Sequence, residues 1–364
     1  MADKRNSNIE VLRIISVFII ILNHYSIYGG FEFENPLSFN AMTIQFLHMG
    51  GKLGVDIFIF ISGWFTSQSK NFNVKRIVRL GLQVLFYSVI LASTGLLLNT
   101  QSLKSTIRML GAIPFGNWIF ITSYFMLFCL SPFLNMLIRT MTKKQYLTIL
   151  IFLGITWCIF PTFVQADFAM SNTAWYIYIY MLAGFLRKYQ NTIPDKPKRW
   201  LVLGTGSVVL IAVSEIILEI LGKTVSPFFA SHAEHFRSMN SILILSATVF
   251  LFLGFAQLPP KNSSVVEKIA STSLAVFILH DNGALRPVIW TKIFHTTEFS
   301  DSALLILHAF ATATIIFAVG CAIDLIRQYT IEKAVLKPVF ALTDRIESKY
   351  NEIIDRFCSE TETQ

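Results

Sequence analysis

The chain has 364 residues, of which 54% are hydrophobic and only 14% are charged. A soluble domain carries about a quarter charged residues, so this composition excludes a soluble protein and predicts one embedded in a membrane. The formal net charge is +8, but the basic residues fall between hydrophobic stretches, so we expect no nucleic-acid partner. The four cysteines show no short spacing, which argues against a metal site and a disulfide framework.

Hydropathy predicts about ten membrane spans and therefore an all-α polytopic membrane protein. We place the spans at residues 9–29, 44–66, 77–98, 117–138, 147–163, 173–187, 200–221, 239–257, 268–282 and 302–326. The spans at 173–187 and 268–282 are short, and we expect tilted or interrupted helices there.

The lysines and arginines indicate the orientation, because basic residues concentrate on the cytoplasmic side. With a cytoplasmic N-terminus, 22 of the 30 Lys and Arg residues fall in inside segments and 7 in outside segments. We therefore predict that both termini are cytoplasmic and that the chain is a multi-pass protein of the cell membrane. Residues 1–329 then form one transmembrane domain, and residues 330–364 form a cytoplasmic C-terminal helix and tail.

The first span carries Arg13 near its start and His24 near its end, with Asn23 beside the histidine. Eleven residues make three helical turns plus about 20°, so both side chains lie on one helix face, about 16 Å apart along the axis. Ionisable groups inside a span are costly and point by default into a bundle or a wet cavity. The alternative is that Arg13 only extends to the interface and His24 only bonds a neighbouring helix.

The second span contains a buried carboxylate, Asp56, after a segment with three glycines, Gly50, Gly51 and Gly54. The glycines predict either close approach to another helix or a break in the outer half of this one. His48 lies eight residues before Asp56 and shares its helix face.

The third span begins with the strongest basic segment, which contains Lys75, Arg76 and Arg79. Arginines three residues apart share a face, and two guanidiniums suit phosphate recognition by paired hydrogen bonds. Ordinary anchoring at the inner membrane surface explains the same residues.

Three later segments carry polar or aromatic groups. Trp118 and Tyr124 fit an aromatic belt at the membrane interface. The loop at 222–238 holds a cluster of His, Glu and Arg side chains that is either a sugar-facing or weak metal site or, as we favour, a solvated loop. The outer end of the ninth span carries His280, Asp281 and Asn282, which lie level with His24 if the topology holds.

The order of these motifs resembles one known family. Arg13 and His24 are similar to the Arg-x10-His element in the first span of the acyltransferase-3 family of integral membrane acyltransferases. Further segments look like later motifs of that family: Gly51-x-x-Gly54-Val55-Asp56-x-Phe58-x-x-x-Ser62-Gly63, Arg76-x-x-Arg79, Trp118 through Ser131-Pro132, and Ser273 through His280. The likeness covers about residues 7–330, with mild departures at Ile59 and Trp64.

The resemblance implies transfer of an acyl group, usually acetyl, from cytoplasmic acyl-coenzyme A to a hydroxyl of an extracytoplasmic or lipid-linked carbohydrate. The opening NIEVLR looks most like members that modify bacterial surface polysaccharides. The expected partners are acyl-CoA as donor, a carbohydrate acceptor and membrane lipid, with no metal. The tail lacks the esterase-like domain of some members, so we expect a stand-alone transferase.

Each basic site residue then has an expected role. Arg76 and Arg79, with Lys75, hold the phosphates of coenzyme A at the inner mouth. Arg13 lines the route of the pantetheine arm, which must run continuously from that mouth towards the outer end of the bundle. His24 deprotonates the acceptor hydroxyl, because imidazole titrates near neutral pH.

The remaining candidates have roles that the sequence leaves open. The tetrahedral oxyanion needs a hydrogen-bond donor, for which Asn23, Ser62 and His280 are unranked candidates. Asp56 orients a histidine or binds the acceptor.

Two other classes compete with an acyltransferase. The intramembrane His, Asp and Arg side chains could instead form the proton relay of a transporter or lipid-linked sugar flippase. The sequence halves show no repeat, which argues against a transporter, and a purely structural scaffold explains none of these charges.

Overall fold

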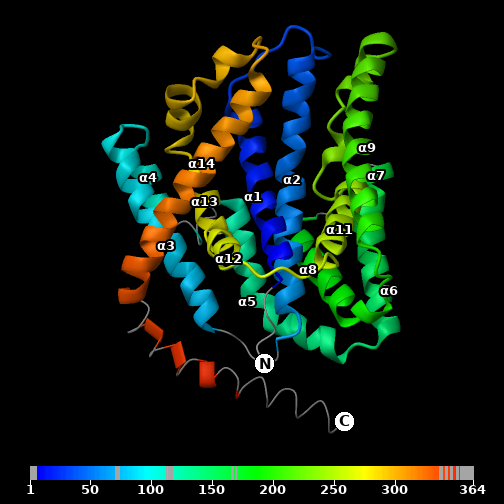
Figure 1. The fold of residues 1–364 in the computed structure, drawn as a ribbon, viewed down its shortest axis with the longest axis vertical. Coiled ribbons are helices and arrows are strands. Elements are labelled where there is room, and N and C mark those ends of the chain that lie inside the picture. Colours follow the sequence, from blue (N-terminus) through cyan, green and yellow to red (C-terminus); the bar gives the residue numbers. More distant parts are fainter. Residues whose placement is uncertain are drawn as a thin grey trace.

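The computed structural model describes residues 6–69, 74–111, 113, 118–164, 168, 170–335 and, in the tail, 339–340, 343–344, 347–349 and 352. Helices and the loops between them make up this part of the chain, which contains no strand, so the all-α prediction is confirmed (Figure 1). The predicted C-terminal helix and tail, residues 330–364, lies only partly within the described residues.

Eight segments of the described chain are helical, long and apolar enough to cross a membrane. They are α1 (Ser7–Tyr28), α2 (Phe39–Thr66), α3 (Val74–Leu97), α5 (Ile119–Thr140), Lys143–Val164 with α6 (Lys143–Gly154) and α7 (Phe160–Val164), α9 (Pro197–Thr224), Pro227–Ala256 with α10 (Pro227–Ala230) and α11 (Ile242–Ala256), and Leu305–Val335 with α14 (Leu305–Arg327).

The two predicted short spans have different structures. Residues 173–187 form α8 (Asn172–Lys188), a single helix of 17 residues. Residues 268–282 are interrupted at Thr272, between α12 (Ser264–Ser271) and α13 (Ser273–His280). The predicted interruption is therefore confirmed for 268–282, and it leaves the end of α13 inside the bundle. The short helix α4 (Leu103–Leu110), outside the predicted spans, follows α3.

Local sequence explains where several helices begin. Ser38 precedes α2 and its hydroxyl accepts a hydrogen bond from the amide of Ala41, which satisfies a free donor of the first turn. Thr142 and Gln145 form a reciprocal capping box at the start of α6.

The packing of α1 against α2 organises the centre of the bundle, and glycines make it possible. A Cβ on Gly50 would collide with the carbonyl oxygen of Ile19, and a Cβ on Gly54 would collide with that of Ser16. The two helix backbones therefore touch, as predicted from the glycines. The alternative, a break in this helix, is wrong because α2 is continuous through all three glycines.

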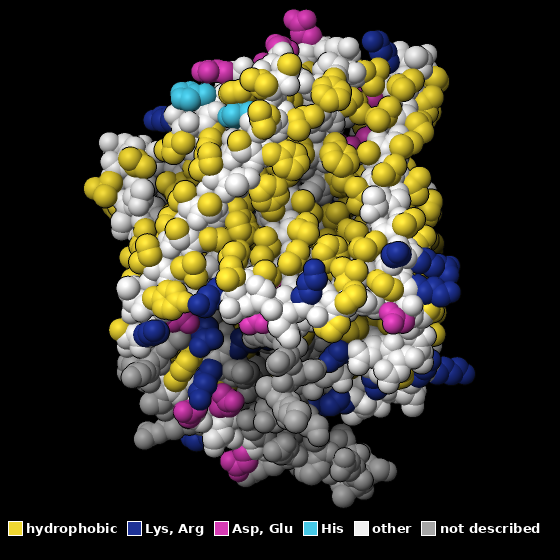
Figure 2. Space-filling model, in the orientation of Figure 1, with side chains coloured by type: hydrophobic (Ala, Val, Ile, Leu, Met, Phe, Trp, Pro, Cys, Tyr) yellow, Lys and Arg dark blue, Asp and Glu magenta, His cyan; other side chains and the backbone are white. Residues whose placement is uncertain are grey.

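Hydrophobic side chains cover the middle of the face shown in Figure 2, whereas lysines and arginines gather towards its lower end. In Figure 1, α1 begins and α14 ends at this lower end. The predicted aromatic belt is wrong for Trp118 and Tyr124, because both are buried among the helices and not at a lipid interface.

Candidate functional site

A pair of buried histidines joins α1 to α13. Nδ1 of His24 lies 2.8 Å from Nε2 of His280, and both rings are shielded from solvent. His280, at the end of α13, therefore lies level with His24 as predicted. Because the helix is interrupted at Thr272, α13 is a separate short helix that ends at His280.

The hydrogen bonds fix which ring nitrogens carry protons. Nδ1 of His280 lies 2.6 Å from the carbonyl oxygen of Val276, which can only accept, so this nitrogen is protonated. In neutral His280, Nε2 is then an acceptor, and Nδ1 of His24 must donate to it. A neutral His24 consequently presents an unprotonated Nε2, which is the form that a general base requires.

A carboxylate faces this free nitrogen. Oδ1 of Asp281 lies 3.7 Å from Nε2 of His24 and accepts from Nε of Arg286 at 3.2 Å. The Arg286 guanidinium stacks 4.1 Å from the ring centroid of Tyr28, and the indole of Trp118 donates to the Asp281 carbonyl at 3.1 Å. Sequence reasoning missed Arg286 and Tyr28, because no spacing rule links α1 to the loop after α13.

The side chains of Asn23 and His24 contact different helices. Its side-chain oxygen packs against Gly51 of α2, whereas His24 contacts α13. Its Nδ2 is buried and has no hydrogen-bond partner among the described residues. A buried, unsatisfied donor is costly in a native structure, so this amide is a candidate ligand contact.

Asp56 does not lie with the histidine pair. It is fully buried on α2, and the indole Nε1 of Trp175 in α8 donates to its two oxygens at 3.1 and 3.3 Å. Its hydrogen bonds therefore connect α2 to α8, and orientation of a histidine by Asp56 has no support in this geometry.

The four predicted basic residues line one pocket at the other end of α1. The pocket has a volume of about 560 Å³ and is lined by Glu10, Arg13, Phe65, Lys75, Arg76, Arg79 and Phe340. The α1 helix is continuous between Arg13 and His24, so the two residues share a face as predicted. The structure therefore brings Arg13 together with the other three cations, while the roles of all four stay a prediction.

Acidic and aromatic side chains hold the pocket's cations in place. Arg13 pairs with Glu10 at 2.8 Å, and Arg79 pairs with Glu332 at 3.1 Å. Lys75 pairs with Asp344 of the tail at 2.6 Å. The two partners in the tail, Glu332 and Asp344, were not predicted, because a contact between α3 and the tail depends on the tertiary fold.

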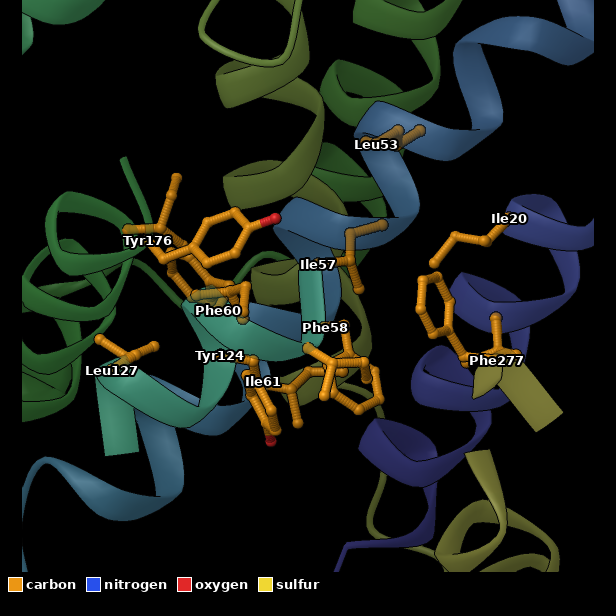
Figure 3. Close-up of a cluster of buried hydrophobic side chains, with 14 of the residues drawn as sticks. Ile20, Leu53, Ile57, Phe58, Phe60, Ile61, Tyr124, Leu127, Tyr176 and Phe277 are labelled. Atoms are coloured by element: carbon orange, nitrogen blue, oxygen red, sulfur yellow. The ribbon is translucent and has the colours of Figure 1, made fainter. Parts of the chain in front are cut away.

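Among the described residues, the basic pocket does not extend to the histidine pair, so the expected continuous route is not seen as one cavity. The lining of the basic pocket does not include His24. Buried aromatic side chains of α2, α5 and α13 occupy the space between them, among them Phe58, Tyr124 and Phe277 (Figure 3).

The loop cluster at 222–238 is more ordered than a solvated loop. Arg237 is buried and its Nη1 lies 3.2 Å from Oε1 of Glu215 in α9. Glu234 also pairs with Arg237, and Nε2 of His235 lies 2.5 Å from the carbonyl of Thr162. Our preference for a solvated loop is therefore wrong for Arg237, whose buried charge is paired within the fold.

The fold and the two ends of α1 define a multi-pass membrane protein with a cationic pocket at one end and a buried histidine pair at the other. An acyltransferase domain matches residues 6–326, nearly the whole chain, and the chain belongs to the acyltransferase-3 family. The resemblance drawn from the motifs is thus confirmed, and the family implies acyltransferase activity. Comparisons with curated proteins and with solved structures gave no match.

Proposed function

We propose that the protein moves an acyl group, acetyl in the first instance, from cytoplasmic acyl-coenzyme A to a hydroxyl of an extracytoplasmic or lipid-linked carbohydrate such as a surface polysaccharide. The single observation that carries the proposal is the polarity of α1. One end lines a pocket with three further cations, and the other end presents a histidine whose tautomer suits a general base. The excess of basic residues on one side supports a cytoplasmic position for the pocket, in a protein of the cell membrane.

The basic pocket suits the phosphate-bearing part of coenzyme A. Arg13, Lys75, Arg76 and Arg79 offer cationic donors around one cavity of about 560 Å³, and arginine matches phosphate oxygens with two parallel bonds. The side chains of Phe65 and Phe340 add aromatic surface to the same lining. The donor then enters from the inner leaflet with its thioester directed towards His24.

The transfer step uses the free nitrogen of the histidine pair. Nε2 of His24 takes the proton from the acceptor hydroxyl as its oxygen attacks the thioester carbonyl. The tetrahedral intermediate collapses with cleavage of the carbon–sulfur bond, and the proton passes from His24 to the departing thiolate. The products are the carbohydrate ester and free coenzyme A. Asp281, 3.7 Å away, stabilises the transient imidazolium.

The contacts rank the three candidates for the oxyanion donor. The Ser62 hydroxyl bonds the Phe58 carbonyl and Tyr124, and both ring nitrogens of His280 are engaged. Asn23 has a buried N–H donor without a partner among the described residues. We therefore assign oxyanion stabilisation to Asn23, an effect of the kind that contributes about 3–4 kcal/mol in other acyl transfers.

The experiment uses purified protein in lipid nanodiscs, with radiolabelled acetyl-CoA and a cell-envelope extract of the source organism. His24→Ala should lower transfer by about 10²–10⁴-fold while acetyl-CoA still binds, because only the base is lost. The matched control is His232→Ala, in the loop at 222–238, whose ring packs against Phe228 and which should transfer normally. Normal transfer by the His24 variant would remove the catalytic assignment.

A further inference from the structure

A row of aromatic side chains connects the two ends of the site. The row consists of Phe128, Tyr124 and Phe120 on one face of α5 and Phe277 on α13. The ring centroids of neighbouring members lie 4.7 Å (Phe128–Tyr124), 5.7 Å (Tyr124–Phe120) and 4.6 Å (Phe120–Phe277) apart. The Arg76 guanidinium lies 4.6 Å from the ring at one end, and the His24 ring lies 6.0 Å from the ring at the other.

The aromatic row spans the distance between the basic pocket and the histidine pair, which the donor arm has to cross. Trp118, just before α5, donates to the carbonyl of Asp281 beside the histidines, and Phe128 lies under Arg76 of the basic pocket. The α5 helix therefore runs from the histidine end to the basic end, opposite to α1. Its row residues are four apart and share a face, covering about 12 Å, against about 16 Å between Arg13 and His24.

The rings fill this region instead of leaving it open. Phe277, Tyr124 and Phe128 are buried, and Phe120 is half-buried. Phe58 of α2 lies beside Tyr124 with ring centroids 5.5 Å apart (Figure 3). The polar group of the row, the Tyr124 hydroxyl, bonds Ser62 at 3.0 Å. A substrate that reaches His24 from the basic pocket must displace these rings.

We propose that the donor's arm follows the aromatic row, and that Phe277 and Phe120 form the wall that restricts the transferred acyl group to a short chain. The inference rests on the proposed function and adds which donors the site accepts. The thioester carbonyl must lie close to Nε2 of His24, so the acyl chain extends into the space around that ring. Phe277 occupies one side of it, and Tyr28 occupies another at 5.4 Å between ring centroids.

Packing sets the expected selectivity. Phe277 is 4% exposed and packs against both Phe120 and His24, so a donor arm lying along the row leaves little space beside this ring for additional methylenes. One methylene changes discrimination in a tight apolar pocket by about 10–200-fold. We therefore expect acetyl-CoA to be preferred over butyryl-CoA by at least about 100-fold in the unmodified protein.

The experiment measures transfer from acetyl-CoA, butyryl-CoA and hexanoyl-CoA, together with release of the free thiol in the absence of acceptor. Phe277→Ala and, separately, Phe120→Ala should raise butyryl relative to acetyl transfer by about 10-fold or more. Phe277→Trp should narrow the space further and lower butyryl transfer below the level of the unmodified protein. Binding of coenzyme A itself should not change, because the phosphate-binding pocket lies at the other end of the row. The matched control is Phe152→Ala on α6, a phenylalanine that is 63% exposed.

The outcomes separate this inference from the function on which it rests. Suppose that the unmodified protein transfers acetyl and that the alanine variants show the same ratio of butyryl to acetyl transfer. Phe277 and Phe120 then do not restrict the acyl chain, and the acyltransferase assignment stands. The inference also fails if the unmodified protein uses hexanoyl-CoA as well as acetyl-CoA. If no coenzyme A thioester supports transfer or thiol release by the unmodified protein, the proposed function itself is wrong. The two alanine variants lie on different helices, so failure of one to fold leaves the other as the test.

Discussion

His280→Ala tests whether the histidine pair sets the reactive form of His24. The substitution removes the Nε2 atom that lies 2.8 Å from Nδ1 of His24. The Nδ1–H of His24, in a ring that is nearly excluded from solvent, then loses its acceptor. A buried donor without a partner costs about 1–3 kcal/mol. If this cost disfavours the reactive arrangement of His24, the rate falls by roughly 5–150-fold.

The assay is steady-state transfer from acetyl-CoA in nanodiscs. We expect kcat to fall by this factor, whereas the donor KM stays within about twofold, because the basic pocket lies about 16 Å away along α1. His280→Gln offers an amide oxygen in place of Nε2 and should recover part of the loss. Unchanged kcat in His280→Ala would refute the reasoning. An equal loss in the alanine and glutamine variants would do so too, because it would show that the acceptor atom is not what matters.

Three further predictions concern other parts of the chain. Replacing both Arg76 and Arg79 with alanine should weaken acetyl-CoA binding by at least about 10-fold, measured by calorimetry, since the pocket loses two of its four cations. Asp344→Ala should lower the donor KM, because it frees the pocket lysine that Asp344 holds at 2.6 Å for a donor phosphate. Gly54→Ala should destabilise the fold by about 1–3 kcal/mol, seen as a lower melting temperature, because the new Cβ meets the Ser16 backbone.

Each of these predictions has a matched control. Arg139→Ala with Lys144→Ala removes two cations that do not line the pocket and should leave donor binding unchanged. Asp301→Ala removes a carboxylate that lines a separate pocket with Glu32 and Glu34, and it should leave the donor KM as it is. Gly206→Ala adds a Cβ that meets nothing within 4 Å and should not destabilise α9. Equal effects in a variant and its control would contradict the corresponding prediction.

Sequence patterns predicted the features that depend on one helix. The spacing of Arg13 and His24, the glycines of α2 and the basic start of α3 all follow from helical periodicity. Features that depend on contacts between distant helices were harder to predict. To predict that His280 lies level with His24, the positive-inside orientation was needed in addition to helical periodicity.

The missed features share one cause, which is tertiary contact without a local sequence signal. The bond between Trp175 and Asp56 joins α8 to α2, and no local pattern links these two helices, so the prediction that Asp56 orients a histidine or binds the acceptor did not include this partner. Trp118 and Tyr124 read as interface aromatics because hydropathy cannot distinguish a lipid-facing ring from one inside the bundle. Pairing of Lys75 with Asp344 joins α3 to the tail, which no local pattern anticipates.

The geometry of α1 also limits how the protein can admit its donor. One continuous helix carries both Arg13 and His24, and backbone contact at Gly50 and Gly54 joins this helix to α2. The distance between the two ends is therefore set by helical rise and resists change by hinge motion. Opening a route between them must come from side chains, and the aromatic row supplies rings that can rotate without moving the helices that carry the chemistry.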